Sequence, residues 1–293
     1  MMKELDIKLS YQCNNACIFC LNKDKRRSGN PFEMIKETVG SFAKNGGEKL
    51  IVSGGEPLIS EHFFELLIFA KQSGIKSLEI QTNARMLYYE NMVRKLKEFE
   101  PIGFLVSFHF PNDQLYRKYS QSNGFHQTVQ GMKNLMKHDC SFSTNTVIMK
   151  PNLPYLKDII KILKELKIRR SQYRFIDGKN VIDNYKEFVP RYSECLSLVK
   201  EVLKENPDIR ISLREFPVCV VGEEFKNYLA FCINPGRLNL TTQGMVLTTK
   251  KIEGDQFVFP NCENCLYNRS GCSGVRKEYV DVYGIKEFKP IIK

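Results

Sequence analysis

Three cysteines near the N-terminus, Cys13, Cys17 and Cys20, are the residues of this chain whose type and spacing best suit chemistry. They lie within eight residues, at C-x3-C-x2-C spacing. Cysteine thiolates are the usual ligands of iron–sulfur clusters, and a cluster of four irons needs four ligands. Because no fourth cysteine is nearby, one iron would stay open to bind a reactant. The triplet therefore predicts a 4Fe-4S cluster with one vacant iron.

A zinc site and unrelated core cysteines are the two other interpretations of this triplet. Zinc sites usually combine a C-x2-C pair with a second pair of ligands, and no histidine is near the triplet in the sequence. The triplet follows an alternating run, Leu5, Ile7 and Leu9, that is typical of a strand. We therefore expect the cysteines on the loop after a first strand, and we favour the cluster.

The triplet, with Phe19 directly before its third cysteine, resembles the signature of the radical S-adenosylmethionine (radical SAM) enzymes. The segment Gly54-Gly55-Glu56-Pro57 is similar to the GGEP motif of the same family. In that family three thiolates hold a 4Fe-4S cluster, and the open iron binds the methionine part of S-adenosyl-L-methionine. A low-potential electron then cleaves SAM to a 5′-deoxyadenosyl radical. The resemblance implies SAM as a cofactor and an electron donor such as flavodoxin or ferredoxin as a partner.

Strand and helix patterns alternate over the first 208 residues and must position these motifs. Strands are expected at 3–10, 49–53, 78–82, 103–108, 142–149 and 173–176, and helices at 30–45, 61–73, 86–99, 125–138, 154–167 and 191–205. Such a series favours a parallel sheet with covering helices and right-handed connections. Six units, not eight, predict an α/β fold with a partial (β/α)6 barrel, which is also the architecture of the radical SAM family.

Each motif falls at the carboxyl end of an expected strand, where barrel enzymes place their chemistry. The resemblance implies that Gly54 to Pro57 meets the amino group of SAM and that Glu56 accepts hydrogen bonds from it. Glycines at that point permit close backbone approach, although Gly-Gly and Pro also form ordinary turns. Phe19 is expected beside the adenine, or else in the core.

Small polar residues end three further strands. Thr82 and Asn83 resemble the TNG-type loop of the family, although Ala84 replaces the usual glycine. Ser107 and Asn145 occupy positions where related enzymes contact the ribose or the carboxylate of SAM. For each residue the alternative is that it only satisfies local backbone groups.

From about Ile209 the alternation stops, and residues 209–293 are expected to form a small irregular domain after the barrel domain of residues 1–208. This part resembles the auxiliary cluster domains of radical SAM enzymes, of the SPASM and twitch types. Because Thr249 stands where the SPASM pattern has its next cysteine, we expect one auxiliary 4Fe-4S cluster rather than two. The preferred ligands are Cys219, Cys262, Cys265 and Cys272, with Cys232 as a possible alternative, and a structural zinc is the competing interpretation.

Composition narrows the class of protein further. Ten cysteines without an N-terminal apolar signal favour the reducing cytosol and metal ligation over disulfides. No apolar stretch reaches transmembrane length, so we expect a cytoplasmic protein without a membrane partner. The net charge of +11 permits nucleic acid or another acidic partner, but lysines scattered over every expected helix favour a basic background.

These observations predict a radical SAM oxidoreductase that abstracts a hydrogen atom from its substrate. The auxiliary cluster would remove a second electron or bind the substrate. By analogy with SPASM-type enzymes, the leading hypothesis is the oxidation or crosslinking of a ribosomally made peptide. The alternatives are a dehydrogenase or epimerase of a sugar, cyclitol or nucleoside, and a nucleic-acid-modifying enzyme. No RNA-binding module supports the last of these.

Overall fold

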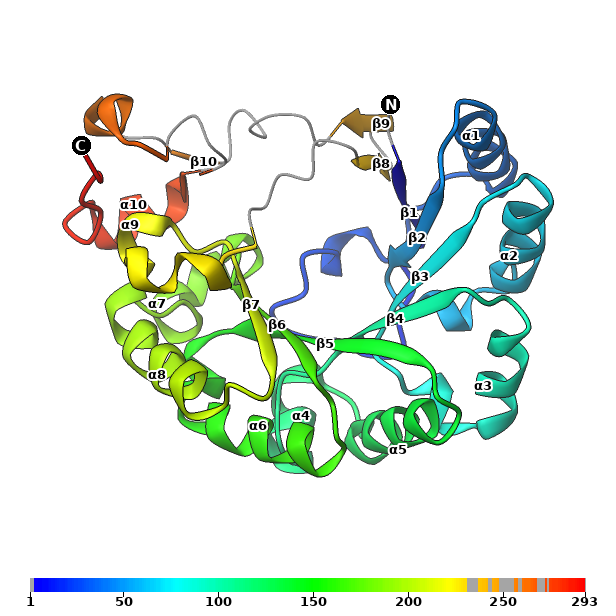
Figure 1. Ribbon diagram of the computed structural model, residues 1–293, viewed down its shortest axis with the longest axis horizontal. Helices are drawn as coiled ribbons and strands as arrows, with labels where there is room; N and C mark the ends of the chain where they lie inside the picture. Colours follow the sequence, from blue (N-terminus) through cyan, green and yellow to red (C-terminus); the bar gives the residue numbers. More distant parts are fainter. Residues whose placement is uncertain are drawn as a thin grey trace. The chain divides into compact units, whose positions relative to one another are not determined.

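Strands alternate with helices from the N-terminus to residue 214 in the computed structural model (Figure 1). The structure describes residues 3–230, 237–241, 244–247, 256–257, 260–267, 272 and 274–292. The strands are β1 (Glu4–Ser10), β2 (Lys49–Gly54), β3 (Ser77–Thr82), β4 (Ile102–Ser107), β5 (Ser141–Ile148), β6 (Arg170–Phe175), β7 (Arg210–Arg214), β8 (Arg237–Thr241), β9 (Gly244–Leu247), β10 (Gln256–Phe257) and β11 (Val275–Arg276).

The helices that follow these strands are mostly short. The α-helices are α1 (Phe32–Lys44), α2 (Phe63–Gln72), α3 (Glu90–Lys97), α4 (Asp113–Ser120), α5 (Phe125–Lys137), α6 (Leu156–Glu165), α7 (Tyr185–Phe188), α8 (Tyr192–Glu205), α9 (Val218–Val221) and α10 (Lys277–Tyr283). Short 3-10 helices include η1 (Lys23–Lys25), η2 (Pro57–Ile59), η3 (Met86–Tyr88) and η7 (Pro260–Asn264).

The first of two compact units comprises Met1–Phe108, Asn112–Thr144 and Pro235–Thr249. Its strand order is β4-β3-β2-β1-β8-β9, with β1 to β4 and β8 parallel to their neighbours and β9 antiparallel to β8. Alternate residues of β1, such as Leu5 and Ile7, are fully buried. The expected alternation of apolar side chains therefore does form the first strand.

The second compact unit comprises His109–Pro111, Asn145–Asn234 and Lys250–Lys293. Within it, β5 precedes β6, and β6 pairs in parallel with β7 from Arg170↔Arg210 to Arg174↔Arg214. Strands β10 and β11 form a separate antiparallel pair. The prediction of an α/β fold built on an open, parallel sheet is confirmed.

Two details of the predicted fold are wrong. The alternation does not stop at Ile209, because β7 is a seventh parallel strand and β8 pairs in parallel with β1. In β7 only Ile211 and Leu213 are buried between arginines, and that pattern is too short to stand out in the sequence. Between the strand expected at 103–108 and the helix expected at 125–138, for which the sequence predicts no helix, the structure has α4.

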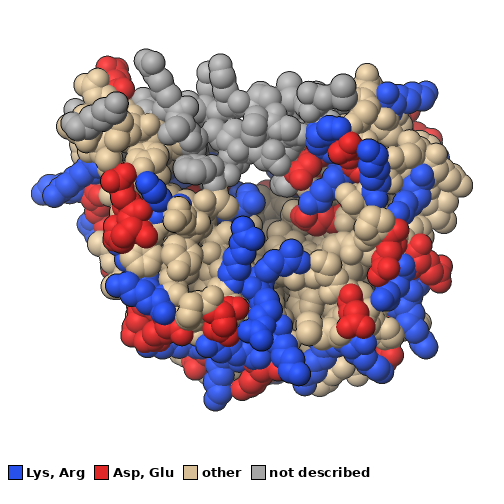
Figure 2. Space-filling view, in the orientation of Figure 1, with Lys and Arg blue, Asp and Glu red and all other residues tan. Residues whose placement is uncertain are grey.

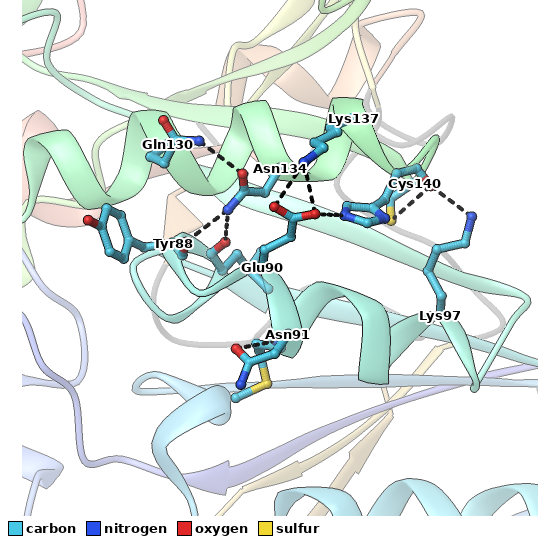
Figure 3. A network of polar contacts seen from close by, with 11 residues as sticks. Tyr88, Glu90, Asn91, Lys97, Gln130, Asn134, Lys137 and Cys140 are labelled. Atoms are coloured by element: carbon cyan, nitrogen blue, oxygen red, sulfur yellow. Dashed lines mark hydrogen bonds and ion pairs between the residues drawn. The ribbon is translucent and has the colours of Figure 1, made fainter.

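Helix α5 holds the segment that follows β3 (Figure 3). The buried Asn134 of α5 donates two hydrogen bonds of 2.9 Å, to the backbone oxygens of Leu87 and Tyr88. A Cβ atom on Gly131 would lie 2.2 Å from the backbone oxygen of Ala84, so the helix touches this segment directly. The loop after β3 is therefore fixed from two sides, by its own strand and by α5.

Acidic and basic side chains are interspersed on one face of the molecule (Figure 2). Many pairs lie on the helices, as with Lys137 and Glu90 at 2.9 Å or Lys157 and Glu201 at 2.7 Å. Such exposed pairs contribute little to stability.

Candidate functional site

The three N-terminal cysteines lie together on the loop after β1, in the first unit. None forms a disulfide, and all three are partly exposed. Burial, together with the neighbouring charges of Cys20 and Cys13, raises the pKa of Cys17 to about 12. The three sulfur atoms therefore lie close to one another, and a bound cation would favour the thiolate form of Cys17.

Hydrogen-bond donors already point at two of these sulfurs. The backbone nitrogen of Asn15 lies 3.4 Å from Cys13 Sγ, and that of Asn22 lies 3.4 Å from Cys20 Sγ. The side-chain nitrogen of Asn83 lies 3.8 Å from Cys13 Sγ. Donors of this kind stabilise a thiolate and tune a metal that it binds. The donor set fits a cluster that is held by three cysteines.

Arg85 anchors the cysteine loop from the neighbouring β3 end. Its Nη1 donates to the backbone oxygen of Asn14 and to Asn15 Oδ1, the latter at 2.9 Å, and its Nε donates to Gln127 Oε1 at 2.7 Å. The buried Asn15 in turn donates to the hydroxyl of Tyr116 at 2.9 Å. The sequence analysis missed these positioning residues. The only feature of the sequence that pointed to them is the arginine two positions after Asn83.

The two glycines of the GGEP segment bring the end of β2 against the cysteine loop. Gly54 has a φ of +122°, and a Cβ atom there would lie 2.3 Å from the backbone oxygen of Ser10. A Cβ atom on Gly55 would lie 2.0 Å from the backbone oxygen of Gln12. The backbone nitrogens of Gly55 and Glu56 donate to these same oxygens at 2.7 and 2.8 Å. Glycine is therefore required here by the approach of the cysteine loop itself.

Glu56 is fully buried and connects the ends of β2 and β3. Its Oε1 accepts from Thr82 Oγ1 at 2.7 Å and from the backbone nitrogen of Leu58 at 3.2 Å, and its Oε2 accepts from the backbone nitrogen of Asn83 at 2.7 Å. Burial raises its pKa to about 7, and these hydrogen bonds oppose the rise. Both carboxylate oxygens thus have partners within the protein. Pro57, also buried, begins η2 directly afterwards.

Thr82 and Asn83 follow in sequence at the end of β3, and they contact Glu56 and the cysteine loop. Besides its contact with Glu56, Thr82 Oγ1 accepts from the backbone nitrogen of Ala84 at 2.9 Å. Asn83 Nδ2 donates to Asn14 Oδ1 at 2.7 Å, so its side chain reaches the cysteine loop. Ala84 adopts a φ of +63°, a left-handed conformation that suits glycine and explains why the family loop has one there.

Three further residues, Phe19, Ser107 and Asn145, are expected to contact SAM. Phe19 is buried, with 9% of its surface exposed. Ser107 ends β4 and is half-buried. Asn145 belongs to the second unit, where its Oδ1 accepts a hydrogen bond of 2.7 Å from Gln172. The direct hydrogen bonds of the first unit link the cysteine loop, the GGEP segment and Thr82-Asn83.

A second group of four cysteines lines one pocket in the second unit. These are Cys219, Cys262, Cys265 and Cys272, and Val218, Tyr267, Gly274, Phe288 and Pro290 complete the wall. Burial, together with the charges of Cys272, Cys262 and Cys265, raises the pKa of Cys219 to about 12. The preferred set of auxiliary ligands is therefore brought together from three separate segments. The alternative ligand, Cys232, lies outside the described residues.

The spacing within these two groups bears on the zinc interpretation. Among the residues that the structure describes, no group of three or more His, Cys, Asp or Glu side chains could hold one metal ion. A zinc ion needs its thiolates about 2.3 Å from one common centre. In a cluster each cysteine binds a different iron, so its thiolates stand farther apart. The choice between a cluster and zinc at either group therefore stays a prediction.

The other described cysteines are buried apolar residues, as expected. Cys195 is fully buried, and its sulfur lies 3.4 Å from the backbone oxygen of Tyr192. Cys140 is 9% exposed. None of the helices in the described part of the chain combines the length and the apolar character needed to cross a bilayer.

Comparison with known proteins places this arrangement among enzymes. The family described as the Radical SAM superfamily matches residues 7–163. A relative, the probable GTP 3',8-cyclase of Methanocaldococcus jannaschii, is 26% identical over 258 residues, which cover 83% of each chain.

Two solved structures share the fold. The crystal structure of Streptococcus suis SuiB bound to precursor peptide SuiA superposes with a TM-score of 0.67 at 18% identity. It covers 85% of this chain, which spans 59% of that longer chain. A structure of anSMEcpe with bound AdoMet and a peptide has a TM-score of 0.68 at 15% identity and covers 98% of this chain and 92% of its own.

Proposed function

Because this chain is an enzyme of the radical SAM superfamily, we propose that it uses two iron–sulfur clusters to oxidise a substrate from which it first removes a hydrogen atom. The family's cofactors are a 4Fe-4S cluster and S-adenosylmethionine. When bound, they supply one electron and a 5′-deoxyadenosyl radical, which is chemistry that no side chain can provide. The tasks of the chain are then to hold, orient and shield these groups.

Cys13, Cys17 and Cys20 would hold the first cluster through three irons and leave the fourth for SAM. The donors from Asn15, Asn22 and Asn83 support thiolates at this place. The backbone of the GGEP segment lies directly against the cysteine loop and would face the amino group of SAM. Glu56 would act mainly by fixing Thr82 and Asn83, since its oxygens accept hydrogen bonds from them.

For the rest of SAM we propose the residues that the resemblance implied. Phe19 would contact the adenine, and Ser107 and Asn145 the ribose or the carboxylate. Thr82 and Asn83 would contribute through the loop that they form. Each of these assignments is open to direct test by substitution, with the Km for SAM as the readout.

Cys219, Cys262, Cys265 and Cys272 would hold the second cluster, and this group of four is the observation that carries the proposal. They line one pocket, although up to 53 residues separate them in the sequence. Four thiolates leave no iron vacant. We therefore assign the second cluster to electron removal rather than to substrate binding, and residues 209–293 to an auxiliary cluster domain of the SPASM/twitch type that follows the barrel domain of residues 1–208.

We propose a ribosomally made peptide as the substrate, with an oxidation or a crosslink as the outcome. The fold of the chain is shared with SuiB, solved with a precursor peptide, and with anSMEcpe, solved with a peptide. The anSMEcpe alignment covers 98% of this chain and 92% of that chain, which supports a shared fold over most of the length. Oxygen-sensitive clusters suit a reducing compartment such as the cytosol.

A nucleotide is the second candidate substrate, because relatives of similar length are named GTP 3',8-cyclases. It agrees with the alternative of a small-molecule enzyme that acts on a nucleoside. The fully ligated second cluster would then act beside the nucleotide and not bind it.

Anaerobic reconstitution tests the proposal. We expect about eight irons per chain, four in each cluster, and release of 5′-deoxyadenosine when dithionite and SAM are added. Cys17→Ala should abolish this release, whereas Cys140→Ala should preserve it. If Cys17→Ala still cleaves SAM, the assignment of the first cluster fails. Deuterium transfer into 5′-deoxyadenosine from labelled peptides, but not from labelled GTP, would support the peptide; the reverse result would establish the nucleotide.

A further inference from the structure

A basic segment, residues 23–27, begins directly after the cysteine loop. It contains four cations and a single acid, Asp24. Lys23 and Arg27 are exposed, and Lys25 and Arg26 are partly exposed. The proposed reaction needs one electron from outside for each SAM that is split, and this segment lies beside the place where the electron must arrive.

Hydrogen bonds tie the basic segment to the cysteine loop. The backbone nitrogen of Lys23 donates to the backbone oxygen of Cys20 at 3.3 Å, and that of Lys25 donates to the oxygen of Asn22 at 3.1 Å. Asn22 itself reaches Cys20 Sγ with its backbone nitrogen and the backbone oxygen of Gly54 with its side chain. The backbone of the basic segment is therefore fixed directly beside the cysteine loop.

An apolar residue and a further cation extend this surface. Leu21, between Cys20 and the basic segment, is 47% exposed. Lys118 of α4 is also exposed, and the next two residues of α4 accept backbone hydrogen bonds of 3.0 and 2.9 Å from Ile18 and Ala16 of the cysteine loop. A protein interface commonly combines an apolar contact with a polar, charged rim.

We propose that Leu21 and the basic segment form the docking surface for a small acidic protein that carries one electron, an inference that rests on the proposed function. Opposite charge accelerates the encounter of two proteins and orients them. The carrier would lose one electron at this surface, and one S–C bond of SAM would break for each electron received. RNA is also attracted by cations. However, residues 21–28 contain no aromatic side chain on which a base could stack.

The test compares two double variants of the reconstituted enzyme. Lys23→Glu with Arg27→Glu reverses two charges of the basic segment, and Lys44→Glu with Lys133→Glu makes the same change in net charge at exposed positions of α1 and α5. Binding of flavodoxin is titrated at low and high salt. SAM cleavage is measured with reduced flavodoxin and, separately, with reduced methyl viologen, which needs no protein interface.

We expect the first variant to bind flavodoxin at least about tenfold more weakly at low salt, with a similar loss in flavodoxin-driven cleavage. The difference from the unchanged enzyme should shrink as salt screens the charges. The control variant should bind as the unchanged enzyme does, and both variants should retain viologen-driven cleavage.

Equal weakening in both variants, or none in either, would overturn the docking surface. Loss of salt-sensitive RNA binding in the first variant, with flavodoxin binding unchanged, would overturn it in favour of nucleic acid. Absence of viologen-driven cleavage in the unchanged enzyme would instead refute the proposed function, so the two failures can be told apart.

Discussion

At the residue scale, the backbone and the side chains of the GGEP segment have different functions. Gly54 and Gly55 are glycines because the cysteine loop passes too close for a Cβ atom. Glu56 uses its carboxylate to join two strand ends rather than to face solvent. A motif that suggested cofactor contact therefore also has an architectural function, which is to hold Cys13 to Cys20 in place.

The raised pKa of Glu56 predicts how stability depends on pH. Its folded pKa is about 7, above its ordinary value of 4.5. A carboxyl group with a raised pKa stabilises the fold fully below its unfolded pKa, and this contribution is lost as the pH rises through 7. Between pH 5 and pH 7 we expect the free energy of unfolding of the protein without clusters to fall by about 1 kcal/mol per pH unit from this group.

Urea unfolding of the unchanged protein and of Glu56→Gln at several pH values measures this effect. The variant loses a hydrogen-bond acceptor and should be less stable at pH 5, but its stability should change less between pH 5 and pH 7. Parallel curves for the two proteins would show that Glu56 does not titrate in this range.

At the scale of elements, the segments that follow β1, β2 and β3 contact one another because helix α5 fixes the loop after β3. Asn134 of α5 bonds the backbone of Leu87 and Tyr88, and α5 touches Ala84 through Gly131. Arg85, which follows Ala84, then positions the cysteine loop by donating hydrogen bonds to Asn14 and Asn15. The helix thus contributes to the site by positioning this loop.

Asn134→Ala should therefore destabilise the protein and loosen the loop. One buried and one partly buried backbone oxygen lose their donor, and we expect a loss of about 1–3 kcal/mol in the free energy of unfolding. Asn91→Ala, on the adjoining α3 (Figure 3), removes only an exposed contact with the backbone nitrogen of Met92 and should cost less than about 0.5 kcal/mol. Similar losses in the two variants would contradict the role given to Asn134.

Ala84 offers a test of the turn itself. A non-glycine residue in the left-handed region costs about 1–2 kcal/mol, so Ala84→Gly should raise the free energy of unfolding by up to about 1 kcal/mol. Ala70 is equally buried but lies inside α2. Ala70→Gly should therefore lower the free energy of unfolding by at least about 1 kcal/mol. Thermal or urea unfolding compares the two, and a loss of stability in both variants would reject the strain at Ala84.

At the scale of the whole molecule, each compact unit contains its own set of cysteines. The first has the triplet after β1, and the second has the four cysteines of the pocket. Because the sets do not share residues, either cluster should assemble without the other. Radical generation and the later removal of an electron would then be separable functions.

Cys265→Ala should separate them. We expect about four irons per chain after reconstitution instead of about eight, with 5′-deoxyadenosine still released from SAM. Substrate product should not form, since the second electron has no acceptor. A variant that keeps all its irons, or one that still forms product, would argue against the four-cysteine assignment.

The sequence by itself determined the α/β class, the cysteine triplet and the preferred group of C-terminal cysteines. Strand alternation such as Leu5, Ile7 and Leu9 and the spacing of Cys13, Cys17 and Cys20 are local patterns, and they can be read from neighbouring residues. The position of polar motifs at strand ends followed from the parallel topology, because such ends meet at one edge of a sheet.

Only the tertiary structure decided which partners these residues have. Arg85 and Asn15 are 70 positions apart, Asn134 bonds an oxygen 47 positions away, and β8 pairs with β1 from the far end of the chain. Contacts at such separation depend on how whole elements pack, and no local pattern encodes them. For the same reason the fold adds a role for Glu56 that no local pattern shows, since its carboxylate joins two strand ends, and its contact with the cofactor stays a prediction.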